Sequence, residues 1–189
     1  MIGNDIVDLN LAAKESNWKR PGMHSKIFTE EERKLLKKAK NQEQRFWLFW
    51  AMKEAAYKAH QRRFSLPRKF NPKSFRCEPD PSGGLGSSGM VKIDNWSYFT
   101  SAKISEKAIH CVASVENSEV KKIIFSDTIN LKQELISAVA NSKKLSFKDL
   151  DIKKDLNFIP HLILKGKNYN LPFSISHHGN YSAYVFAVN

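Results

Sequence analysis

The sequence predicts an α+β fold on three observations. Residues 41–63 contain no Gly or Pro, and their apolar side chains recur at the spacing of a helix. Residues 130–141 show the same spacing and predict a second, amphipathic helix. Runs of strand-forming residues precede and follow these helices, at 2–9, 90–93, 97–102, 108–115, 150–152, 162–164 and 181–188. A chain of 189 residues is long enough for one domain or two small ones.

The first predicted strand, residues 2–9, is interrupted by Asp5. An Asp among apolar strand residues packs poorly, so it either faces a cleft or a cation, or it ends the strand in a turn. A short helix is expected over residues 10–19, and Pro21-Gly22 would break it.

A further helix start lies at Phe28-Thr29-Glu30-Glu31-Glu32. Thr29 suits the N-cap and Glu32 the reciprocal position of a capping box. Acids in the first turn also suit the positive end of the helix dipole. This pattern has a structural explanation without any function, and the helix is expected to end near Lys40.

The main helix is predicted to begin at Asn41, which can act as N-cap with Gln44 as its reciprocal partner. Glu54 and Lys58 lie four residues apart and therefore share a face, which Trp47 and Ala51 extend backwards. A charge on the apolar side of a helix needs a counter-ion or a bound ion. The alternative is a surface Glu–Lys pair with snorkelling ends.

A basic stretch follows, with eight basic residues and one acid between Lys53 and Arg76. Such a stretch could hold phosphates or an acidic protein, or form an ordinary solvated face. Residues 84–89 match the dinucleotide pattern GxGxxG, but no strand precedes them and no helix follows, so a hairpin loop is expected instead. His110, in an apolar strand, is expected to be structural.

The C-terminal segment 172–179 places His177 and His178 beside Gly179, which suggests a site on a loop. As a zinc site the pair is weak, because no third ligand lies at a useful spacing. As a phosphate site it is favoured by neighbouring Ser hydroxyls and backbone N–H groups.

The net charge of +12 favours an anionic partner: nucleic acid, a phosphorylated small molecule, an acidic protein or a membrane surface. Cys77 and Cys111 have no metal-site spacing and predict core thiols in a reduced, cytoplasmic protein. The first residues lack the pattern of a signal peptide, and no apolar run reaches the length of a membrane span.

Four motifs together resemble the 4′-phosphopantetheinyl transferase superfamily: Gly3-Asn4-Asp5-Ile6, Phe28-Thr29-Glu30-Glu31-Glu32, Trp50 to Lys58, and Ser174-Ile175-Ser176-His177. The resemblance implies transfer of phosphopantetheine from coenzyme A to a serine of an apo acyl or peptidyl carrier protein, releasing 3′,5′-ADP, with Mg²⁺ as cofactor. It also implies an α+β fold of two related repeats, each a helix packed on a small antiparallel sheet.

The order of the motifs is that of the small, trimeric holo-acyl-carrier-protein synthases, but the length fits neither that form nor the two-repeat form. Residues 1–117 resemble the second repeat of the larger form and residues 118–189 its first repeat. This resemblance implies a circularly rearranged monomer whose repeats form a pseudo-dimer, with a trimer as the alternative.

The resemblance assigns roles to individual residues. Asp5 and Glu54 would bind Mg²⁺, and Glu54 would also act as base for the incoming serine. Lys58 would contact the transferring phosphate and help the leaving group. The phosphates of coenzyme A would be held by Ser176 and His177 and, as a further candidate, by Arg45.

Two departures from the family pattern weaken this assignment. Val7 stands where the two-repeat form usually has an acid, so that Asp8 is the nearest spare acid, and Ile159 replaces the usual basic residue before Pro160. Two carboxylates still suffice for Mg²⁺, which keeps several waters. The position of Val7 leaves a non-catalytic family member as one alternative.

A basic nucleic-acid-binding module is the other alternative. It would need basic and aromatic residues alternating on an exposed sheet. Here the aromatics cluster at helical spacing around Glu54. We therefore expect neither nucleic acid nor a membrane among the partners.

Overall fold

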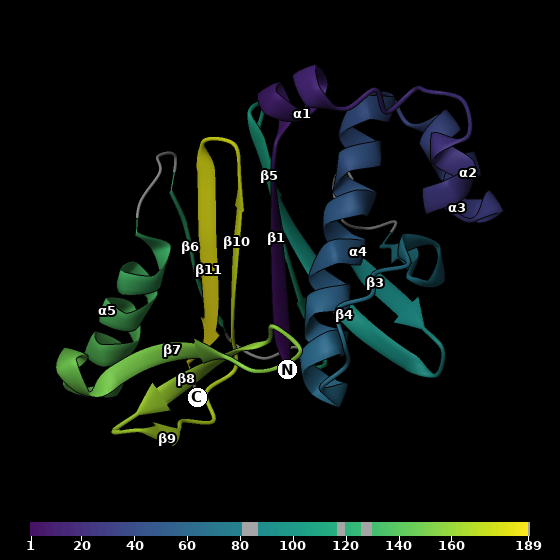
Figure 1. The fold of residues 1–189 in the computed structure, drawn as a ribbon. Helices are drawn as coiled ribbons and strands as arrows, with labels where there is room; N and C mark the ends of the chain where they lie inside the picture. The colour runs from purple at the N-terminus through teal and green to yellow at the C-terminus, as the bar shows by residue number, and fades with distance from the viewer. Residues whose placement is uncertain (81–86, 117–119, 126–129, 189) are drawn as a thin grey trace.

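The structure, a computed structural model, describes residues 1–80, 87–116, 120–125 and 130–188 (Figure 1). Its first part contains β1 (Ile2–Asp8), α1 (Leu9–Glu15), α2 (Met23–Ile27), α3 (Glu30–Lys38), α4 (Gln42–Phe64), η1 (Pro72–Ser74), β2 (Arg76–Pro79), β3 (Ser88–Ile93), β4 (Trp96–Ile104) and β5 (Ala108–Ser114). Its second part contains β6 (Val120–Phe125), α5 (Leu131–Lys143), η3 (Phe147–Asp149), β7 (Leu150–Lys154), β8 (Pro160–Leu164), β9 (Lys167–Asn168), β10 (Phe173–His178) and β11 (Tyr181–Ala187).

The predicted α+β class is confirmed: helices pack on sheets whose neighbouring strands are all antiparallel. In the first part, α4 lies along a five-stranded sheet of order β1-β5-β4-β3-β2 (Figure 1). The core between them holds fully buried aromatic and aliphatic side chains, among them Phe46, Phe49, Ala55, Tyr98 and Ile109. This packing holds one face of α4 against β1.

In the second part, α5 packs against a three-stranded sheet of order β10-β11-β6, and β7-β8-β9 form a small third sheet beside it. Leu135 and Val139 of α5 are fully buried against β11 residues such as Phe186. That the two parts are related repeats, divided at residues 117 and 118, stays a prediction, and residues 117–119 lie outside the described chain.

The two parts meet along β1 and β10, which run side by side in Figure 1. Side chains of β10 accept hydrogen bonds from the backbone of β1: Asn4 N–H donates to Ser174 Oγ at 3.0 Å, and Asp8 N–H donates to His178 Nδ1 at 2.9 Å. Ile2 and Val185 are buried together at the same seam. The seam therefore fixes β10 against the strand that carries Asp5.

Most element predictions are confirmed, with shorter helices at 9–15 and 30–38 than expected. The capping box of Thr29 and Glu32 is present. The short helix α2 was not predicted, and it begins after Gly22, whose φ of 80° lies in the left-handed region that glycine tolerates. The glycine-rich residues 84–86 lie outside the described chain, but β2 and β3 on either side pair as a hairpin.

Three smaller expectations are also settled. Asp5 lies within β1, so the alternative that it ends the strand in a turn is wrong. Asp8 ends the strand instead and caps the start of α1. His177 and His178 end strand β10, so the expected loop is wrong as well. Cys77 and Cys111 are free, buried thiols, as predicted.

Within the described residues, no helix is both long and apolar enough to cross a membrane.

Candidate active site

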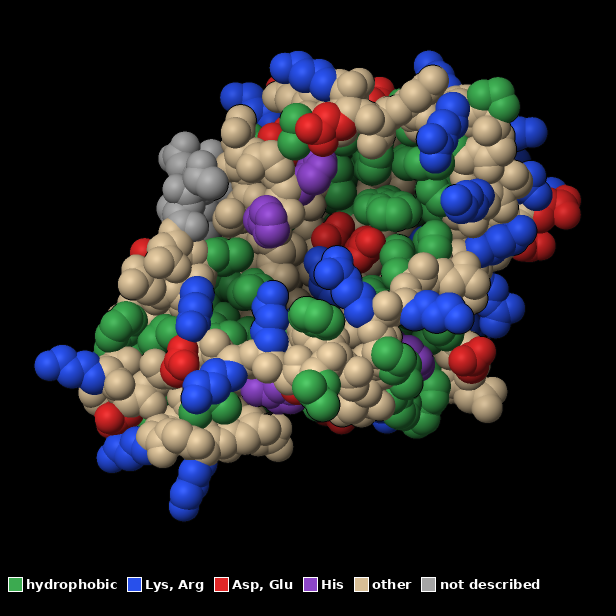
Figure 2. All heavy atoms as spheres, viewed as in Figure 1, with side chains coloured by type: hydrophobic (Ala, Val, Ile, Leu, Met, Phe, Trp, Pro, Cys, Tyr) green, Lys and Arg blue, Asp and Glu red, His purple; other side chains and the backbone are tan. Residues whose placement is uncertain are grey.

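A cavity of about 400 Å³ lies between α4 and the second part of the chain. The first part contributes Glu54, Tyr57, Lys58, Gln61, Arg62 and Arg68, and the second contributes Lys154, Asn157, Phe158, Pro160, Ile175, Ser176 and His177. Figure 2 shows a hollow on this face in which acidic side chains lie deep beside Lys or Arg side chains, with histidines at its edge. Both parts of the chain are needed to form it.

Asp5 and Lys58 form an ion pair beside this cavity. Lys58 Nζ lies 2.9 Å from Asp5 Oδ1 and also donates to the backbone oxygen of Asn4 at 3.0 Å. Gly3 makes this approach possible, because a Cβ there would collide with the backbone of Ala55 and Ala59 in α4. The strand can therefore lie directly on the helix, which brings Asp5 to the helix face that carries Glu54 and Lys58.

Glu54 is a desolvated acid. Burial, and to a smaller extent the negative charge of Asp5, raise the pKa of Glu54 to about 7 against the opposing charges of Lys58 and Arg68. The alternative of a surface Glu54–Lys58 pair is not supported, since Lys58 pairs with Asp5 instead. Burial likewise raises the pKa of Asp5, against the attraction of Lys58. A buried carboxylate, Asp5, and a partly buried one, Glu54, thus lie near one lysine that forms an ion pair with Asp5 alone.

These two carboxylates fit a hard divalent cation. Mg²⁺ prefers oxygen ligands and keeps several waters, so two carboxylates and substrate oxygens form a sufficient set. Within the described residues, no cluster of three or more His, Cys, Asp or Glu could hold a metal alone. A cation bound by Asp5 and Glu54 would therefore leave most of its coordination positions to water and phosphate oxygens.

The pH dependence of stability follows from the raised pKa of Glu54. In the metal-free protein, Glu54 takes up its proton at a higher pH in the folded than in the unfolded state, so its contribution to stability declines as pH rises from about 4.5 to about 7. We expect Glu54→Gln to remove that decline. The melting temperatures of wild type and Glu54→Gln, measured between pH 4.5 and 8 in the presence of a chelator, would show the difference. If the two melting temperatures changed with pH in parallel, the raised pKa of Glu54 would be contradicted.

The residues of the C-terminal motif divide between the two faces of β10, as alternation in a strand requires. Ser174 and Ser176 are buried at the seam, where Asn4 Nδ2 donates to Ser176 Oγ at 2.9 Å. His177 is exposed on the other face and lines the cavity. Ser176 and His177 both line the cavity that Glu54 and Lys58 line, and their contact with phosphates stays a prediction.

His110 is structural, as expected. Its Nε2 lies 3.1 Å from Asn4 Nδ2, and burial lowers the pKa of His110 to about 4, so the ring is neutral at physiological pH. Asn4 thus joins His110 on β5 to Ser176 on β10. Sequence reasoning missed this role of Asn4, although a polar residue next to Asp5 in an otherwise apolar strand was a visible signal.

Two assigned residues lie elsewhere. Arg45 does not line the cavity; it borders another hollow near the start of α4, with its guanidinium over the ring of Phe49. Asp8 is no spare metal ligand, because its carboxylate accepts backbone N–H groups of Asn10, Leu11 and Asn180. Burial alone would raise the pKa of Asp8, but these hydrogen bonds lower it overall.

Several cavity residues had no assignment from the sequence: Tyr57, Gln61, Arg62, Arg68, Lys154, Asn157 and Phe158. Arg62 and Arg68 belong to the basic stretch, whose charge was the only signal. The other part of the chain reaches them through the β7–β8 turn, where Asn157 Nδ2 donates to Ser65 O and Asn157 O accepts from Gln61. The spacing of residues along the sequence does not indicate contacts between segments so far apart in the chain.

Comparison with known proteins identifies the family of this chain. The sequence model of the 4′-phosphopantetheinyl transferase superfamily matches residues 1–113, more than half of the chain, and the protein belongs to that superfamily. Among solved structures, the chain is similar to the holo-[acyl-carrier-protein] synthase (AcpS) of Thermotoga maritima, with 13% identity, 88% of this chain and 83% of that chain covered, and a TM-score of 0.45. No curated protein matches its sequence.

Proposed function

We propose that this protein transfers the 4′-phosphopantetheine group of coenzyme A to a serine of an apo acyl or peptidyl carrier protein and releases 3′,5′-ADP. The observation that carries the proposal is the pair of desolvated carboxylates, Asp5 and Glu54, with Lys58 2.9 Å from Asp5 at the end of a basic cavity. A transferase acting on a pyrophosphate needs this combination of a cation site and a nearby ammonium.

Asp5 and Glu54 would hold Mg²⁺, which when bound neutralises the pyrophosphate and withdraws charge from the leaving group. The serine oxygen forms a bond to the phosphorus next to pantetheine, and the bond between this phosphorus and the bridging oxygen of 3′,5′-ADP breaks. Glu54 accepts the serine proton, directly or through a water molecule. Lys58, one helical turn away, stabilises the charge on the transferring phosphate.

The charge around the cavity supports a polyphosphate ligand. Lys58, Arg62, Arg68 and Lys154 line it against the single acid Glu54. His177 adds donor capacity from β10. The net charge of +12 also suits an acidic carrier protein. Because both halves of one chain line the cavity, we further propose a monomer of two repeats, 1–117 and 118–189.

Intact-mass spectrometry tests the function. The protein is incubated with coenzyme A, Mg²⁺ and an apo acyl carrier protein, and in parallel with an apo peptidyl carrier. A mass gain of one phosphopantetheine group on either carrier is the expected result. Binding of coenzyme A without transfer to any carrier would favour a non-catalytic member of the family, and absence of coenzyme A binding would contradict the proposal.

A further inference from the structure

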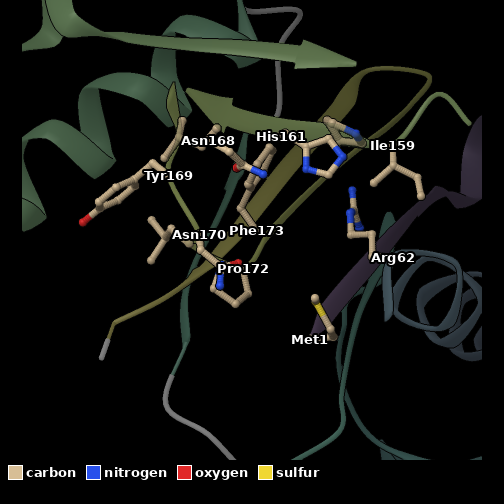
Figure 3. Close-up of a pocket in the computed structure, with 12 residues that line it drawn as sticks. Met1, Arg62, Ile159, His161, Asn168, Tyr169, Asn170, Pro172 and Phe173 are labelled. Atoms are coloured by element: carbon tan, nitrogen blue, oxygen red, sulfur yellow. The ribbon is translucent and has the colours of Figure 1, made fainter. Parts of the chain in front are cut away.

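Arg62 lies one helical turn beyond Lys58 and lines two cavities at once. One is the 400 Å³ cavity of the candidate active site, and the other is a smaller cavity of about 60 Å³, shown in Figure 3. Figure 3 places Arg62 beside Ile159 and His161, at the edge opposite Asn168 and Tyr169. No motif in the sequence assigned a role to this arginine.

The guanidinium of Arg62 has no counter-ion among the described residues. Its Nη1 donates to Ser174 Oγ at 3.0 Å and to Ile2 O at 3.4 Å, both neutral acceptors, while its Nε is buried without a partner. Burial lowers the pKa of Arg62 to about 10, and no neighbouring acid offsets the shift. The side chain therefore stays charged at neutral pH in surroundings that disfavour the charge.

The same helix shows how this fold satisfies a cation that serves only the structure. Lys53 is fully buried, and its ammonium lies 2.8 Å from a carboxylate oxygen of Glu32 and donates to the backbone oxygens of Pro72 and Phe75. Arg62 has no such acid. A partly buried charge whose Nε is fully buried and has no counter-ion costs stability, so its retention beside a cavity points to an anion that arrives with a ligand.

We infer that Arg62 binds a phosphate of the leaving group, the 3′,5′-ADP half of coenzyme A. This inference rests on the proposed function. Arg62 is four residues beyond Lys58, which is about 6 Å along the helix axis. With Lys58 at the transferred phosphorus, Arg62 therefore reaches a phosphate further along the cofactor. The planar fork of a guanidinium can donate two parallel hydrogen bonds to phosphate, which a lysine cannot.

Calorimetric titration of Arg62→Met and Arg63→Met tests the inference. Arg63 is the matched control: its substitution removes the same charge from the next residue, but its guanidinium stacks on Trp96 at 3.9 Å and does not line the cavity. Arg62→Met is expected to weaken coenzyme A and 3′,5′-ADP by about tenfold or more, the value of a charged hydrogen bond. Binding of 4′-phosphopantetheine, which lacks the ADP half, should change little, and Arg63→Met should stay within about twofold of wild type.

Dephospho-coenzyme A separates the two phosphates that Arg62 could reach. If Arg62→Met also weakens this ligand, the contact is with the pyrophosphate; if only coenzyme A is weakened, the contact is with the 3′-phosphate. Equal affinities of wild type and Arg62→Met for both coenzyme A and 3′,5′-ADP would overturn the inference, as would equal losses in Arg62→Met and Arg63→Met. Failure of the wild type itself to bind coenzyme A would instead overturn the proposed function.

Thermal melts show whether a loss of affinity in Arg62→Met is caused by unfolding of the variant. Because the charge of Arg62 is uncompensated, Arg62→Met is expected to keep or raise the melting temperature while it loses affinity. Should that variant fail to fold, Arg62→Lys keeps the charge and removes the fork. A several-fold weaker affinity of Arg62→Lys for 3′,5′-ADP supports the contact, and unchanged affinity overturns it.

Discussion

Glu54→Gln is expected to reduce phosphopantetheine transfer by about 10³-fold or more while the fold is retained. Gln has nearly the same shape as Glu but carries no negative charge and cannot accept a proton. The variant therefore loses a carboxylate of the cation site and the proposed base together, and general base catalysis alone contributes about 10² to 10⁴. Initial rates of carrier modification by mass spectrometry, at saturating coenzyme A and Mg²⁺, measure the loss.

Glu43→Gln is the matched control for this experiment. Glu43 also lies on α4 but in its first turn, and it does not line the active-site cavity. The control should transfer within about twofold of the wild-type rate, because it removes a partly exposed charge that lies outside the active-site cavity. A rate in Glu54→Gln equal to that of the control would remove Glu54 from both of its proposed roles.

The parts of the site that local spacing determines could be predicted from the sequence. Glu54 and Lys58 share a helix face because they are four residues apart, and the capping box at Thr29 follows from its distance to Glu32. The position of Asp5 is different, because its contact with Lys58 joins residues 53 positions apart. The family resemblance predicted that Asp5 and Glu54 bind one cation, but neither it nor any periodicity predicted the ion pair of Asp5 with Lys58.

The roles of Asn4 and Arg62 could not be predicted, because they depend on how β10 lies against β1. Asn4 bonds to Ser174 and Ser176 across about 170 residues of chain. Such register is set by the packing of two sheets, which one sequence does not display. The resemblance placed Arg45 at the phosphates, whereas in the structure Arg45 borders another hollow, so its phosphate contact stays a prediction.

The two lysines of the motif on α4 illustrate why residue type alone is a poor guide to function. Lys53 and Lys58 are five positions apart, which turns their side chains by about 140° around the helix axis. Lys58 therefore faces β1 and the cavity, whereas Lys53 faces the core between α3, α4 and β2. Glu32, which the capping box had explained completely at the sequence level, is also the counter-ion of Lys53.

Lys53→Met is accordingly expected to lower the free energy of unfolding by about 3–5 kcal/mol, the usual cost of removing one partner of a buried ion pair. Glu32 would keep the N–H groups of Thr29 and Cys77 but lose the only positive charge within ion-pair distance among the described residues. Urea unfolding followed by circular dichroism measures the change. Lys34→Met is the control, since the Lys34–Glu30 pair is 66% exposed on both sides and should contribute less than about 1 kcal/mol.

The double variant Glu32→Gln/Lys53→Met separates the charge from the packing. Removing both charges leaves no uncompensated carboxylate, so the double variant should be more stable than Lys53→Met alone. If Lys53→Met and Lys34→Met lowered the free energy of unfolding by the same small amount, water would reach Glu32, and the Lys53–Glu32 pair would contribute little to stability. A further outcome is that Lys53→Met lowers the free energy of unfolding strongly without any recovery in the double variant. That outcome would assign the stabilisation to the hydrogen bonds from Lys53 to the backbone of Pro72 and Phe75.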